Sequence, residues 1–129
     1  MEGKLCFIYM PVHDIKSALK FYRDQLDLEE SWREGDLTVA FKLPGTEIEL
    51  MLDQIVEGSP EAAGPVFILP SADAFYNAQQ GQIEFIGKPS DIPGGRWVAA
   101  RDVSGNGLYF LDQSTSREPV PLPPPEGYP

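Results

Sequence analysis

The order of apolar and polar positions divides the chain into two similar halves. In the first half, the apolar and aromatic run Leu5–Val12 predicts a buried strand, and residues 15–26 repeat apolar side chains on one helical face. Three short strands are expected at Glu29–Glu34, Leu37–Leu43 and Glu47–Leu52, with Gly and Pro in the turns between them. The first half therefore predicts one βαβββ unit.

The second half repeats the same order. A strand at Pro65–Pro70 leads into a helix at Ala72–Gln80, which Ser71 is suited to cap as Asp14 caps the first helix. Three more strands follow at Gln82–Gly87, Arg96–Arg101 and Gly107–Asp112. Because one βαβββ unit cannot cover its own sheet face, two units must pair, either within the chain or with a second chain.

This repeat sets the expected domain organisation. We expect one domain over residues 1–113, with a first module at 5–53, a linker at 54–64 and a second module at 65–113. The remaining residues, 114–129, hold six prolines, which cannot continue a helix or donate to a sheet ladder. We interpret this tail as an extended strap or a free end.

Charge narrows the range of partners. The chain has 20 acidic and 10 basic side chains and a formal net charge of −10, which disfavours nucleic acid and anionic membranes and attracts small cations. It has no apolar run long enough to cross a membrane, no recognisable signal peptide and a single cysteine. These features predict a cytoplasmic protein that binds neither nucleic acid nor membranes.

Two segments carry more specific motifs. The first helix begins at Asp14-Ile15 and continues with Ala18, Phe21-Tyr22, Asp24 and Leu26, and the segment Asp102–Phe110 reads DVSGNGLYF. With the repeat, these motifs cover residues 5–113 and resemble the vicinal oxygen chelate superfamily, which contains glyoxalases, bleomycin-resistance proteins and extradiol dioxygenases. The resemblance implies an α+β fold in which the two βαβββ modules form a cupped, mixed and antiparallel eight-stranded sheet with helices on its outer face. It also implies a homodimer.

The resemblance further implies four metal-ligand positions, typically His, Glu, His and Glu on four strands. In this chain they fall on Phe7, Glu49, Pro65 and Tyr109, of which only Glu49 is a usual metal ligand. The chain has a single histidine, His13, so a site with two histidines is impossible within one protomer. His13 itself is expected in a surface turn. We therefore expect a degenerate metal site, with no metal and no other cofactor.

Without the metal, we expect an aromatic pocket on the concave face of the sheet. Its predicted ligand-binding residues are Phe7, Tyr9, Glu49, Met51, Phe67 and Tyr109. Phe41 and Trp97 join this set, although the sequence does not fix which face of their strands they occupy. Aromatic side chains at such positions more often belong to an ordinary hydrophobic core than to a ligand pocket, and Trp32 could pack on the helix or border the pocket. We expect Glu49 to be neutral, to pair with Arg96, Arg101 or a ligand, or to be held by a neighbouring hydroxyl or a water.

Two classes of function remain open at this point. The first is a metal-free protein that binds a small aromatic or cationic molecule, as in drug resistance by sequestration. The alternative is a lyase, isomerase or dioxygenase of the same superfamily. It would use Glu49 as general base and Tyr109 as acid, or a metal site displaced from the expected positions.

Overall fold

The computed structural model describes residues 1–115, and contacts within the chain divide these residues into two modules. The N-terminal module comprises residues 7–63. The C-terminal module comprises residues 1–6 and the described residues from Gly64 onward. The first strand, β1 (Lys4–Val12), therefore contributes residues to both modules. Nearly all of the proline-rich tail predicted at 114–129 lies outside the described residues.

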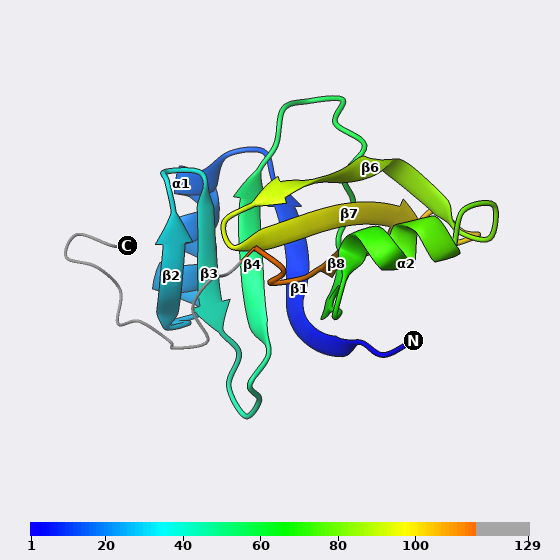
Figure 1. Cartoon of the computed structure of the whole chain (residues 1–129). Coiled ribbons are helices and arrows are strands. Elements are labelled where there is room, and N and C mark those ends of the chain that lie inside the picture. The colour runs from blue at the N-terminus through cyan, green and yellow to red at the C-terminus, as the bar shows by residue number, and fades with distance from the viewer. Residues whose placement is uncertain (116–129) are drawn as a thin grey trace. The chain divides into compact units, whose positions relative to one another are not determined.

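The N-terminal module is a four-stranded sheet with a helix on one face (Figure 1). Its strands follow the order β2-β3-β4-β1, where β2 spans Glu30–Glu34, β3 spans Thr38–Lys42 and β4 spans Glu49–Gln54. Strands β1 and β4 run parallel, and the connection between them passes through helix α1 (Ile15–Leu19) and then through β2 and β3. The other pairs are antiparallel.

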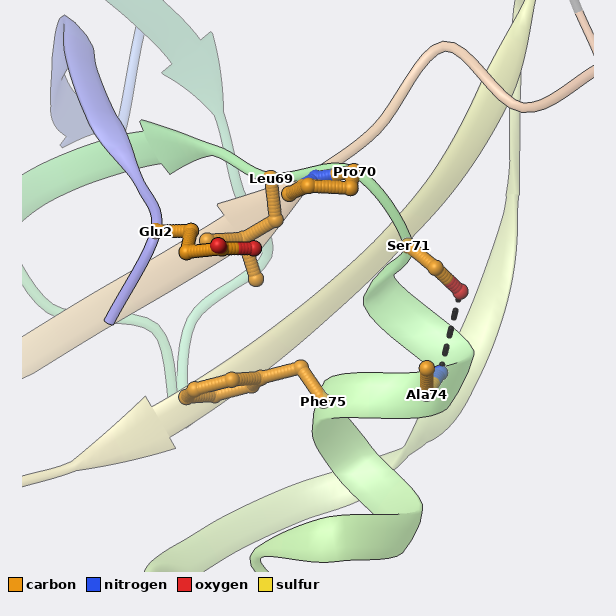
Figure 2. A pocket seen from close by; sticks show the side chains of 6 residues that line it. All are labelled: Glu2, Leu69, Pro70, Ser71, Ala74 and Phe75. Atoms are coloured by element: carbon orange, nitrogen blue, oxygen red, sulfur yellow. Dashed lines mark hydrogen bonds between the residues drawn. The ribbon is translucent and has the colours of Figure 1, made fainter.

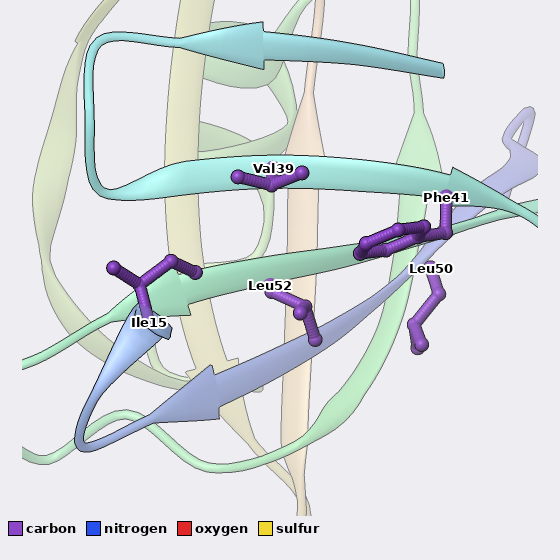
Figure 3. Packing of buried hydrophobic residues seen from close by; sticks show 5 residues of the cluster. All are labelled: Ile15, Val39, Phe41, Leu50 and Leu52. Atoms are coloured by element: carbon purple, nitrogen blue, oxygen red, sulfur yellow. The ribbon is translucent and has the colours of Figure 1, made fainter. Parts of the chain in front are cut away.

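Alternate side chains of β3 and β4 form the core beneath the helix. Val39, Phe41, Leu50 and Leu52 point to the same side of the sheet and meet Ile15 at the start of α1 (Figure 3). Phe41 is fully buried, and its ring centroid lies 6.5 Å from that of Tyr22 on the helical segment. The predicted place of Phe41 in a ligand pocket is therefore wrong, because its side chain faces the helix.

The first helix has the predicted apolar face, but its second half is a π-helix and not an α-helix. Asp14 caps α1 by accepting a hydrogen bond from the Lys16 N–H at 3.3 Å. From Lys20 to Gln25 the chain continues as a π-helix, η1, in which the Leu26 N–H donates to the Phe21 carbonyl at 2.9 Å. The apolar pattern predicts which face is buried, but it does not distinguish the two hydrogen-bonding patterns.

The C-terminal module repeats this design. Its strands follow the order β5-β8-β7-β6, and helix α2 packs against the sheet (Figure 1). The elements are β5 (Gly64–Ile68), α2 (Ala72–Ala78), β6 (Glu84–Ile92), β7 (Gly95–Arg101) and β8 (Gly107–Leu111). Ser71 caps α2 as predicted, since its hydroxyl accepts from the Ala74 N–H at 3.0 Å.

Asp112 joins three elements of the C-terminal module. Its side chain is 1% exposed, and it accepts hydrogen bonds from the backbone N–H groups of Ala72, Arg96 and Ser114 and from the Ser114 hydroxyl. Burial opposes ionisation, but the hydrogen bonds, led by that from Ala72, outweigh it and lower the pKa of this carboxyl. Asp112 therefore fixes the start of α2 against β7 and the end of β8.

The two modules confirm the expected α+β fold class. Each contains one crossover helix on one face of a four-stranded sheet, with one parallel pair and two antiparallel pairs. Within residues 1–115, the helices are too short and too polar for any of them to cross a lipid bilayer.

Candidate functional site

The sheet face turned away from α1 carries most of the predicted site residues of the N-terminal module. The parallel register of β1 and β4 sets Phe7 opposite Glu49 and Tyr9 opposite Met51. The adjoining pairs set Ala40 between Met51 and Trp32. We call this surface, defined by Phe7, Tyr9, Trp32, Glu49 and Met51, the Glu49 face.

Two neutral donors hold the Glu49 carboxylate. The Ser31 hydroxyl donates to Oε2 at 2.5 Å, and the Trp32 indole N–H donates to Oε1 at 2.8 Å. Lys42 lies opposite Glu49 in the β3–β4 register, but its ammonium group pairs with Glu29 at 3.1 Å. The negative charge of Glu49 therefore has no ion-pair partner within residues 1–115.

Of the partners expected for Glu49, Arg96 is wrong, whereas a neighbouring hydroxyl, that of Ser31, is present. The Arg96 guanidinium belongs to the C-terminal module, where it donates to Asp73 at 3.2 Å and to Asp91 at 2.8 Å. The β2 strand supplies the partners of Glu49 instead. A hydroxyl and an indole satisfy the half-buried carboxylate without neutralising it.

An aromatic pair borders the carboxylate. The rings of Phe7 and Trp32 meet edge to face, with centroids 5.7 Å apart and planes at 77°. Phe7, Trp32 and Glu49 are all half-buried, so part of each side chain remains accessible to solvent. This arrangement decides between the two alternatives for Trp32, which lies on the Glu49 face and not beneath the helix.

Sequence reasoning missed a second carboxylate on this face, Asp53. It accepts from the Tyr9 hydroxyl at 2.6 Å and from the Thr38 hydroxyl at 2.8 Å. Asp53 lies four residues after Glu49 on β4, so strand alternation places both on one face, roughly 13 Å apart. The predicted strand ended at Leu52, one residue before Asp53, so the alternation that places Asp53 beside Glu49 was not applied to it.

In the C-terminal module, Trp97 and Tyr109 stack with ring centroids 5.2 Å apart and planes at 28°. They share the sheet face turned away from α2, and Tyr109 is 1% exposed. Phe67 was predicted to join them, but it packs on the α2 side, stacked on Phe110 at 6.0 Å. The reason is the register: Val66, and not Phe67, lies opposite Tyr109.

The residues at the expected metal positions do not fit a divalent cation. Pro65 lies on the α2 side, and its neighbours Gly64 and Val66 carry no side-chain donor. The side chains of Phe7 and Pro65 offer no ligand atom, so Glu49 is the one carboxylate at the four positions. Among residues 1–115, no three His, Cys, Asp or Glu side chains are grouped so that they could hold a metal ion.

A separate hollow of about 240 Å³ lies in the C-terminal module. Leu69 and Phe75 form its apolar wall, Glu2 lies above it, and the Ser71 hydroxyl at its edge is bonded to the Ala74 N–H (Figure 2). The residues predicted from the sequence to bind a ligand do not line this hollow. The Glu49 face therefore remains the candidate site.

The fold and this face define a class: a protein of two βαβββ modules with a single carboxylate left at the usual ligand positions. Residues 5–110 match the family model described as "Glyoxalase/Bleomycin resistance protein/Dioxygenase superfamily". The chain belongs to this superfamily, which confirms the resemblance seen in the sequence. Among curated proteins, none matches the chain significantly.

Solved structures share the fold at low sequence identity. Methylmalonyl-CoA epimerase from Mycobacterium tuberculosis has 15% identity and a TM-score of 0.63, with 84% of this chain and 86% of that chain covered. The epimerase from Streptomyces coelicolor, solved with 2-nitronate-propionyl-CoA, has 16% identity and a TM-score of 0.67, covering 92% and 100%. A hypothetical protein from Bacillus halodurans has 19% identity and a TM-score of 0.67, covering 95% and 100%.

Proposed function

We propose that this protein binds a small aromatic cation on the Glu49 face without a metal ion. The observation that carries this proposal is the Glu49 carboxylate, which is held by two neutral donors beside two aromatic rings. Its charge is fixed in position and is not cancelled by a lysine or an arginine within residues 1–115.

Three physical terms favour such a ligand. The charge of Glu49 attracts a cation directly, and the half-buried setting strengthens this attraction relative to bulk water. Each aromatic face that the cation contacts adds about 0.5–2 kcal/mol. The net charge of −10 raises the local concentration of cations around the whole chain.

Calorimetric titration with benzylammonium tests the proposal, with tryptophan fluorescence as a second signal. We expect saturable binding, and we expect Glu49→Gln to weaken it by about tenfold or more, which corresponds to about 1.4 kcal/mol. Glu47→Gln is the matched control, because Glu47 is exposed and lies two residues before Glu49. Equal affinity in the wild type and Glu49→Gln would contradict the proposal.

A second candidate function is proton abstraction next to a carbonyl group. It is favoured by the half-buried, un-neutralised Glu49 carboxylate, which is a suitable general base, and by the shared fold with the methylmalonyl-CoA epimerases. Incubation with methylmalonyl-CoA in deuterated water tests it by mass spectrometry. Deuterium incorporation that is lost in Glu49→Gln supports this candidate, whereas no incorporation above the protein-free rate contradicts it.

A further inference from the structure

The β2 strand contains an irregularity at the point where it meets Glu49. The β2–β3 register shifts between Glu30 and Trp32, as in a β-bulge. In a regular strand, consecutive side chains point to opposite faces. Here Ser31 and Trp32 are consecutive, yet both donate to the same carboxylate. The bulge therefore builds a two-pronged clamp on Glu49.

The clamp determines which acceptor sites of Glu49 remain for a ligand. An ionised carboxylate offers about four lone-pair sites, two on each oxygen. Ser31 uses one site on Oε2 and Trp32 uses one on Oε1. One site per oxygen remains, and this is the arrangement that a planar fork of two N–H groups satisfies with parallel hydrogen bonds.

We infer that the ligand is a flat cation that donates two N–H groups side by side, such as an amidinium, a guanidinium or a protonated amino-heteroaromatic group. This inference rests on the function proposed above and specifies the chemistry of its ligand. Phe7 and Trp32 supply the aromatic contacts, while the clamped carboxylate selects for paired donors over a bare positive charge.

Two ligands of equal charge and similar size test the inference. Benzamidinium carries paired N–H donors on a phenyl ring, whereas phenyltrimethylammonium carries the same charge on the same ring without any N–H group. For the wild-type protein we expect benzamidinium to bind at least about tenfold more tightly. In Glu49→Gln the preference should fall below about threefold, because the paired anionic acceptors are lost.

Variants of the clamp provide an independent measurement. Trp32→Phe keeps an aromatic ring but removes the indole N–H, and Ser31→Ala removes the hydroxyl, so both leave Glu49 itself in place. We expect each to reduce the preference for benzamidinium by about threefold or more, because the carboxylate is no longer held in one orientation. Thermal melting establishes that each variant is folded before the titrations are compared.

The outcomes separate this inference from the proposed function. If phenyltrimethylammonium binds as tightly as benzamidinium, the requirement for paired donors is overturned, and the cation site stands. If neither compound binds at millimolar concentration, both the inference and the cation-binding function are overturned. If the preference persists unchanged in Trp32→Phe and Ser31→Ala, the clamp does not set it, and the inference is overturned at that step.

Discussion

At the scale of single residues, the hydrogen-bond donors around Asp112 and Glu49 distinguish a structural carboxylate from one that can bind a ligand. Asp112 is 1% exposed and accepts four hydrogen bonds, three from backbone N–H groups and one from a hydroxyl. Glu49 is half-buried and accepts two, both from side chains. Asp112 is thus buried among donors of its own module and is structural, whereas each oxygen of Glu49 accepts one hydrogen bond and retains an acceptor site that a ligand can use.

Replacing Asp112 with Asn should destabilise the protein without changing the candidate site. The amide group of Asn places N–H groups where backbone N–H donors such as those of Ala72 and Arg96 need an acceptor. We therefore expect the unfolding free energy to fall by about 3 kcal/mol, which lowers the melting temperature by roughly 10 °C. Urea denaturation followed by circular dichroism measures this. Asp36→Asn, in the exposed turn between β2 and β3, is the control and should cost less than about 0.5 kcal/mol.

The lowered pKa of Asp112 also predicts a pH dependence of stability. Because its hydrogen bonds hold the folded-state pKa below the unfolded value of about 3.9, Asp112 stabilises the fold above about pH 4. This stabilisation is lost as the pH falls through the folded-state pKa. Urea midpoints measured between about pH 7 and pH 3 should therefore decline less steeply in Asp112→Asn than in the wild type. Parallel curves would show that Asp112 does not carry the effect.

At the scale of elements, strand alternation separates the core from the candidate site. On β3, Phe41 and Val39 face α1, while Ala40 between them lies on the Glu49 face. The same alternation on β5 and β8 sends Phe67 and Phe110 to α2, and Val66 and Tyr109 to the other face. In each module, the register of a strand therefore decides whether an aromatic side chain packs under the helix or lies on the opposite face of the sheet.

Phe41 provides the test of this assignment. Phe41→Ala should lower the unfolding free energy by about 3–5 kcal/mol, because the side chain is fully buried beneath the helix. Leu37→Ala, at a site 48% exposed, should cost about 1 kcal/mol or less. The milder Phe41→Leu should bind benzylammonium within about threefold of the wild type. A larger loss of affinity in a folded Phe41→Leu would mean that this position does reach the ligand.

At the scale of the whole molecule, the excess of acidic residues acts on binding through long-range attraction. The net charge of −10 should make association with a cation sensitive to salt, since charges farther apart than roughly 8 Å are largely screened at physiological ionic strength. Homodimerisation and a cytoplasmic location, which the resemblance and the composition suggest, stay predictions.

Raising sodium chloride from about 20 mM to about 500 mM should weaken benzamidinium binding several-fold. Benzamide, which has the same ring and is uncharged, is the matched control, and its weaker association should change little. If the affinity for benzamidinium does not depend on salt, short-range contacts alone account for binding, and the net charge of the chain does not contribute.

The sequence by itself determined the two βαβββ modules, the caps at Asp14 and Ser71, and Glu49 as the one usual ligand type at the expected metal positions. These features depend on local periodicity and on side-chain chemistry, both of which are visible along the chain. The same local information placed Phe7 on the face turned away from the helix.

Only the tertiary structure decided the faces of Phe41, Phe67 and Trp97, the position of Asp53 on the Glu49 face, and the partners of Glu49. A shift of one residue in register reverses the face of every side chain in a strand, and apolar runs such as Pro65–Pro70 give no alternation from which to choose. The Ser31–Trp32 clamp depends on a bulge that forms only when β2 pairs with β3. Pairing between strands depends on residues far apart in the sequence. It brings Ser31 and Trp32 to Glu49 and so fixes the position of its carboxylate.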